Sequence, residues 1–120
     1  MDVAGPQKRI PLVFFRSETG NEPVRDWLLE LPKADRRVVG IGLKELEFGW
    51  PVGMPLCRAM GAGIFELRVN LASRRIVRVL VCANDDKLVA LHGFIKKSQK
   101  TPAGDLDLAR KRKRQLEKVK

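Results

Sequence analysis

The sequence predicts an α+β fold in which two N-terminal helices pack on a small, mainly antiparallel sheet of three to four strands, followed by a basic C-terminal helix. Three observations support this fold class. Apolar residues recur at helical spacing between residues 23 and 48. Strand-like apolar runs separated by short polar turns fill residues 64–95. A highly charged segment with few apolar residues follows from Asp105.

The N-terminal part of the chain predicts one strand and two helices. Residues 10–15 form a short apolar run typical of a strand. Asn21 is expected to cap the first helix, because its side chain can accept a hydrogen bond from the first turn, and Pro23 suits that turn. Pro32 ends this helix, and apolar residues at helical spacing predict a second helix over residues 33–48.

Three strand-like runs follow the helices. Residues 64–70 alternate between apolar and polar side chains, which predicts a strand with one buried face. Residues 75–83 and 87–95 are nearly continuous in apolar residues, as expected of strands covered on both faces. Short polar segments separate the runs, so the three strands should form an antiparallel meander. The segment 105–120 then predicts a helix with sparse apolar contacts at Leu106, Ala109 and Leu116.

Length and composition are typical of one globular domain. The chain has 120 residues, 44% hydrophobic and 32% charged, which predicts a single domain over residues 1–120 with a flexible leader at residues 1–9. It contains no apolar run long enough for a membrane span and no signal-peptide core, which predicts a cytosolic protein. Cys57 and Cys82 are expected to be buried, reduced thiols, because two cysteines and one histidine provide neither a disulfide framework nor an evident zinc site.

The net charge of +10 is concentrated in the C-terminal quarter. Residues 92–120 contain 10 Lys and Arg against 3 Asp and Glu, a balance of +7. A basic segment on a nearly balanced body indicates a nucleic-acid or acidic-protein partner. A solvated helix surface is the alternative, and composition alone does not decide between them.

Two of the strand runs carry an arginine among apolar neighbours. Arg68 and Arg78 are candidates for holding phosphate against a rigid sheet face. The alternative for Arg78 is an ion pair with Glu66 or Glu45, because an unpaired charge inside a strand is costly. The alternative for Arg68 is a cross-strand pair with Glu66 or Asp86.

Basic residues also cluster where the last strand run ends. Lys96, Lys97 and Lys100 are candidates for RNA contact, and the run 110–114 forms a further basic stretch. His92 is a candidate acid or base because imidazole exchanges protons near neutral pH. On an alternating strand its face also holds Leu88, Ala90 and Phe94. A core position is therefore the alternative for this histidine.

Five segments of the chain together resemble a known family. They are PVRDWLLELPKADR (23–36), GIFELRVN (63–70), RIVRVLVC (75–82), LHGFIKKSQKTP (91–102) and DLDLARKRKRQ (105–115). In order and spacing they resemble the phage-derived, HigB-like branch of the RelE/ParE toxin superfamily. The resemblance implies a type II toxin that acts on mRNA held in the ribosome. It also implies neutralisation by a small helix-turn-helix (HigA-like) antitoxin, in an assembly that can hold several copies of each chain.

The resemblance also implies site residues. Those implied to be catalytic are Arg68, Arg78, His92, Lys96 and Lys97. Lys100, in the adjoining basic turn, is implied to contact RNA. Arg75, Lys111, Arg112 and Lys113 are further RNA-binding candidates from their own positions in basic segments, and the run 110–114 could instead bind an acidic antitoxin segment. The chain contains no tyrosine, and Val77 stands where relatives often carry an aromatic hydroxyl. It therefore departs from the family wherever a phenol takes part in the mechanism.

These residue types suit RNA cleavage without a metal. The 2′-hydroxyl of RNA can attack the neighbouring phosphate if the enzyme removes its proton, stabilises the phosphorane and protonates the leaving 5′ oxygen. Arginine suits the second task because its fork bridges two phosphate oxygens. The expected function is a ribosome-dependent mRNA endoribonuclease that needs no cofactor. The alternatives are a ParE-like inhibitor of DNA gyrase and a nucleic-acid-binding module without catalysis, although the 6% aromatic content argues against a stacking platform.

Overall fold

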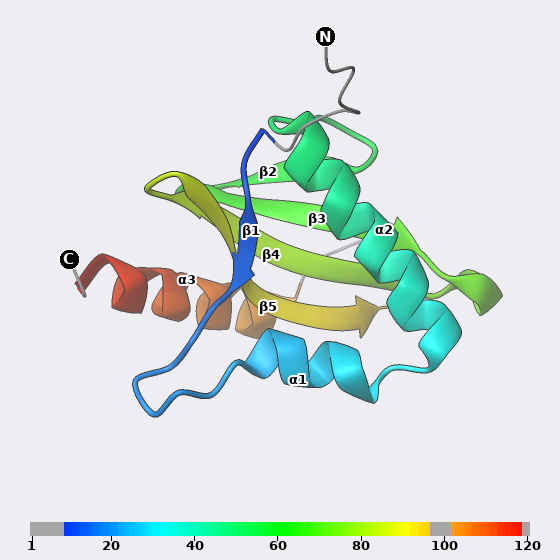
Figure 1. Ribbon diagram of the computed structural model, residues 1–120, viewed down its shortest axis with the longest axis horizontal. Helices are drawn as coiled ribbons and strands as arrows, with labels where there is room; N and C mark the ends of the chain where they lie inside the picture. Colours follow the sequence, from blue (N-terminus) through cyan, green and yellow to red (C-terminus); the bar gives the residue numbers. More distant parts are fainter. Residues whose placement is uncertain (1–8, 97–101, 119–120) are drawn as a thin grey trace, which may run out of the picture.

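The protein consists of one mixed β-sheet with helices on both faces. The computed structural model describes residues 9–96 and 102–118. Its elements in chain order are β1 (Leu12–Phe14), α1 (Pro23–Glu30), α2 (Lys33–Gly49), β2 (Cys57–Gly61), β3 (Ile64–Asn70), a 3-10 turn (Ala72–Arg74), β4 (Ile76–Asn84), β5 (Lys87–Lys96) and α3 (Ala103–Lys118). Figure 1 shows how the sheet separates α1 and α2 from α3.

Within residues 9–96 and 102–118 the sheet has five strands and is mixed, so the prediction of three to four mainly antiparallel strands is wrong. The strand order is β1-β5-β4-β3-β2, and β1 pairs parallel with β5 whereas the other neighbours are antiparallel. The predicted meander agrees with β3, β4 and β5 to within one residue at each end. The prediction missed β2 because its sequence, CRAMG, is short and does not alternate between apolar and polar residues.

Helices cover both faces of the sheet, whereas the prediction placed the packed helices on one. α1 and α2 contribute Val24, Val39 and Leu46 to the larger core. α3 lies on the opposite face, where Ala109 is completely buried in a second cluster with Leu80. Coverage on both sides explains why β4 and β5 have nearly continuous apolar sequences. Among residues 9–96 and 102–118 there is no helix with the length and apolar character of a membrane span.

Two glycines allow the helices to approach the sheet closely. A Cβ atom at Gly42 of α2 would lie 2.7 Å from Cγ2 of Val69 on β3. A Cβ atom at Gly93 of β5 would lie 2.4 Å from Cζ3 of Trp27 on α1. Glycine in the middle of a helix lowers its stability relative to alanine, so Gly42 is explained by the close contact of α2 with β3.

The first helix begins differently from the prediction. Pro23 lies in the first turn as expected, but the N-cap position is Glu22, without a side-chain capping hydrogen bond. Asn21 instead donates from its backbone N–H to Ser17 Oγ at 3.1 Å and from Nδ2 to Thr19 Oγ1 at 3.2 Å. Hydrogen bonds within the β1–α1 loop therefore engage the residue that the sequence pattern assigned to the helix cap.

A β-bulge in β5 determines which way His92 faces. Val81 of β4 pairs with Ala90, but the adjacent Leu80 pairs with His92, so Leu91 is an extra residue. Ala90 belongs to the core under α1 and α2, whereas Leu80 and Leu91 belong to the cluster under α3. The prediction that His92 shares a face with Ala90 is wrong, because the bulge shifts the alternation of side chains by one residue.

Candidate functional site

The candidate site is formed by two adjacent rows of side chains on the sheet face that α3 partly covers. In one row, Arg68 of β3 pairs with Arg78 of β4, which pairs with Phe94 of β5. In the next row, Glu66 of β3 and His92 of β5 both pair with Leu80 of β4. We call Arg68, Arg78, Phe94, Glu66 and His92 the α3-side face. It brings together three of the residues predicted to be catalytic: Arg68, Arg78 and His92.

Arg78 is fully buried and is paired with Glu66. Its Nη1 lies 3.6 Å from Glu66 Oε2, and neither side chain has exposed surface. Arg68 is 18% exposed, and its Nε lies 3.9 Å from the other oxygen of the same carboxylate. Glu66 is thus the partner that sequence reasoning offered as the alternative for both arginines. A buried arginine needs such a counter-charge, and Arg68 is the more accessible of the two guanidinium groups.

His92 is held by a carboxylate from the C-terminal helix. Its Nε2 lies 2.6 Å from Asp105 Oδ1, and the ring stacks on Phe94 with centroids 5.5 Å apart. Because a carboxylate accepts hydrogen bonds, Nε2 carries the hydrogen and Nδ1 is the atom that can accept a proton. His92 also lines a cavity of about 160 Å³ beside Trp27 and Arg112. An oriented imidazole next to a cavity is a suitable general base or acid.

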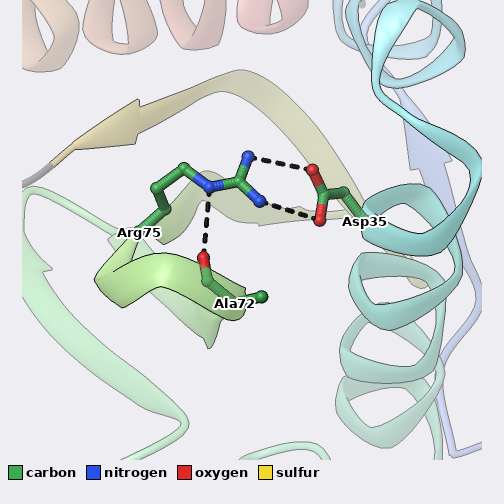
Figure 2. A network of polar contacts seen from close by, with 3 residues as sticks. All are labelled: Asp35, Ala72 and Arg75. Carbon is green, nitrogen blue, oxygen red and sulfur yellow. Dashed lines mark hydrogen bonds and ion pairs between the residues drawn. The ribbon is translucent and has the colours of Figure 1, made fainter.

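Arg75, which was predicted to bind RNA, makes a set of contacts within the protein (Figure 2). Its Nη1 and Nη2 donate to the two carboxylate oxygens of Asp35 at 2.9 and 3.1 Å, and its Nε donates to the carbonyl of Ala72 at 3.1 Å. The bidentate geometry is that of a strong charge-assisted pair. Arg75 therefore ties the start of β4 to the first turn of α2.

The three predicted RNA-binding residues of α3 have different environments. Lys111 is exposed, and Lys113 Nζ lies 3.0 Å from Glu117 Oε2 on the same helix. Arg112 donates from Nη1 to the carbonyl of Leu91 at 2.7 Å and lies over the ring of Phe15, 5.6 Å from its centroid. Burial lowers the pKa of Arg112 from its ordinary value. Arg112 thus anchors α3 to the sheet, and Lys111 is the most accessible of the three cations.

The predicted lysine cluster lies mostly outside the described part of the chain. Lys97 and Lys100 are not among the described residues. Lys96 ends β5 and pairs through its backbone with Ile76. The roles of these three lysines in RNA contact or catalysis stay predictions.

Asp105 is the site residue that sequence reasoning missed. An acidic residue in the first turn of a helix is common, because the helix dipole stabilises it. The sequence therefore provided no reason to assign Asp105 a further role in the site. Its distance of 2.6 Å from His92 arises only when α3 packs on the sheet. A histidine and an aspartate 13 residues apart carry no local spacing signal.

The cysteines have the buried positions that the sequence predicted. Burial, the dominant cause, raises the pKa of Cys57 and of Cys82 to about 11 in each case. Both thiols are therefore protonated at neutral pH and are poor nucleophiles. Within residues 9–96 and 102–118, no three His, Cys, Asp or Glu side chains converge in a way that could hold a metal ion.

Comparison with known proteins identifies the family. No curated protein gave a match to the chain. Residues 26–114 match the family of phage-derived Gp49-like proteins (DUF891), and the match spans α1 to α3 and includes every residue of the α3-side face. The chain therefore belongs to the Gp49-like family of phage-derived proteins, a family of toxin–antitoxin toxins in the RelE/ParE-like group.

Proposed function

We propose that this toxin is an endoribonuclease that cuts mRNA bound in the ribosome and thereby inhibits translation. The observation that carries the proposal is the α3-side face, where Arg68 and Arg78 pair directly across two strands and His92 lies in the adjacent row. The accessible guanidinium group of Arg68 can bind phosphate, and the oriented imidazole of His92 beside it can exchange protons.

The proposed reaction is attack of the 2′-hydroxyl on the adjacent phosphate, with release of the 5′ oxygen. Arg68, the more accessible arginine, contacts the phosphate and stabilises the negative charge of the phosphorane. His92 exchanges a proton with the reacting oxygens while Asp105 holds its ring. Arg78 is not exposed and is paired with Glu66, so its contribution is to balance the buried carboxylate that lies next to Arg68.

Dependence on the ribosome is proposed because the face offers little to order a free strand. Its one aromatic side chain, Phe94, is already stacked on His92, and the chain contains no tyrosine. Binding of flexible single strands relies on stacking of bases on aromatic side chains. Message held by the ribosome arrives already positioned, which lowers the barrier without new chemical groups.

The test compares the wild type with His92→Ala and Arg68→Gln on programmed ribosomes and on naked mRNA. Each substitution should slow cleavage about 100-fold or more, the usual contribution of a general acid–base or charge-stabilising group. Arg74→Gln, which removes an exposed arginine elsewhere, is the matched control. The products should carry 2′,3′-cyclic phosphate ends, and cleavage should persist in EDTA while ribosomes stay intact. Equal rates for wild type and both variants, or efficient cutting of naked RNA, would contradict the proposal.

A second candidate is a toxin that inhibits DNA gyrase by protein contact. The observation that favours it is the complete burial of Arg78 with Glu66, because a transition-state arginine must reach its phosphate. In that case wild type, His92→Ala and Arg68→Gln should all inhibit gyrase supercoiling equally. None of the three proteins should then cut message on the ribosome.

A further inference from the structure

An open groove lies between α2 and the β3 side of the sheet, on the face away from α3. It has a volume of about 350 Å³. Val38, Ile41 and Glu45 line its α2 side, and Pro55, Leu56 and Asn70 line the opposite side. Gly42 and Val69 also line it, at the point where α2 approaches β3 closely. One wall is therefore a helix, and the other is the segment before β2 together with the end of β3.

Exposed apolar side chains gather along this groove. Val38 is 39% exposed and Ile41 is 52% exposed, both on α2. Phe48, 37% exposed, extends the same side of α2 beyond the groove, and Met54, 59% exposed, precedes Pro55 of the opposite wall. These four are most of the six large apolar side chains that are exposed among the described residues. A concentrated apolar surface of this kind indicates a protein interface.

The outer side of α2 next to this apolar surface is basic. Lys33, Arg37 and Lys44 are exposed, whereas Glu45 is the exposed carboxylate of the helix. The other two acidic residues of α2 are buried: Asp35 is paired with Arg75, and Glu47 accepts a hydrogen bond from the backbone of β1. The α2 side of the groove therefore has three exposed cationic side chains and one exposed carboxylate.

We propose that this groove is the docking site of the antitoxin and that the docked segment is an acidic amphipathic helix; this rests on the proposed toxin function. The apolar stripe of the partner helix would lie on Val38 and Ile41, and its flanking carboxylates would face Arg37 and Lys44. Amphipathic helices dock in apolar grooves through residues at i, i+3, i+4 and i+7. Complementary charges along the rim speed association and select the partner.

The same charges argue against a second copy of this chain as the occupant. The chain carries a net charge of +10, and a twofold contact through this groove would place the cations of two α2 helices near each other. Like charges across an interface cost binding free energy. The groove is also separate from the α3-side face except for Arg68, so docking there leaves the other candidate catalytic side chains uncovered.

The experiment uses the full chain and the protein encoded by the neighbouring reading frame. Binding is measured by calorimetry for wild type, Ile41→Glu, the double variant Arg37→Glu/Lys44→Glu, and Leu29→Glu. Leu29 is a matched control, because it is 51% exposed on α1, almost the same as Ile41. Ile41→Glu should weaken binding about tenfold or more, since it puts an unpaired charge against an apolar helix face. The double variant should slow association and flatten its salt dependence, and Leu29→Glu should bind like wild type.

The possible results separate this inference from the proposed function. If all four proteins bind equally well, the groove is not the docking site, although the toxin still has its antitoxin. If the wild type does not bind the protein encoded by the neighbouring reading frame, the inference about the groove is wrong. Cleavage of mRNA on programmed ribosomes then tests the proposed endoribonuclease activity separately. If Ile41→Glu abolishes self-association of the free chain instead, the occupant is a second copy and the proposal is wrong.

Discussion

The Asp35–Arg75 pair provides a direct test of whether a predicted RNA-binding arginine is structural. The variants are Asp35→Asn, Arg75→Gln and the double variant, which together form a double-mutant cycle. Asp35 is 10% exposed and Arg75 is 30% exposed, and two hydrogen bonds of 2.9 and 3.1 Å join them. Hydrogen bonds to charged groups contribute about 1.5–3 kcal/mol, and the partial exposure of Arg75 places this pair at the lower end. Each single variant should therefore lose about 1.5–2 kcal/mol of unfolding free energy.

The assay is urea and thermal unfolding followed by tryptophan fluorescence, with RNA binding measured on the same proteins. A loss of this size should lower Tm by about 5–10 °C for a domain of this length. The coupling free energy between Asp35 and Arg75 should be about 1–2 kcal/mol. Arg74→Gln, an exposed neighbour, should change stability by less than about 0.5 kcal/mol. A coupling below about 0.5 kcal/mol, together with weaker RNA binding by Arg75→Gln, would refute the structural role.

Three further predictions follow from the packing. Gly93→Ala should destabilise the protein by about 1–3 kcal/mol because its Cβ would overlap the Trp27 ring, and thermal unfolding measures this loss. The free energy of unfolding should fall as pH rises from about 9 to about 11, because burial raises the pKa of Cys57 and Cys82 above the ordinary thiol value and unfolding then releases protons. A Cys57→Ala/Cys82→Ala double variant should lose this alkaline decline in stability. An unchanged decline in that variant would contradict the argument from burial. Arg112→Gln should increase hydrogen exchange across α3 relative to α1, since the bond to the backbone of β5 is lost, and unchanged exchange would show that Arg112 does not anchor α3.

Local sequence patterns predicted the helices and the central strands of this protein. Apolar residues at helical spacing define α1 and α2, and the alternation across residues 64–70 gives β3 its two faces. These elements depend on neighbours a few residues away, so periodicity alone identifies them. β2 was missed because its pairing with β3 stabilises a stretch whose own pattern is weak.

The candidate site was predicted only in part. The type of a residue and its position in a strand can be read from the nearby sequence, but the side of the sheet that it faces and its ion-pair partner depend on distant segments. The alternation of residues 64–70 correctly set Arg68 apart from the apolar face. It could not show that one carboxylate, Glu66, serves both Arg68 and Arg78. Nor could it show the bulge at Leu91, which turns His92 toward α3 and its Asp105 partner.

The sequence by itself determined the helices, the three central strands, the bias of positive charge toward the C-terminal quarter and the resemblance to a toxin superfamily. Tertiary structure alone decided the strand order and which cations are engaged inside the protein. Arg75 meets Asp35 across 40 residues of chain, and Arg112 meets Leu91 across 21. Such contacts depend on how distant segments are brought together in space. An arginine that anchors the fold and one that is available to RNA can therefore have the same local sequence pattern.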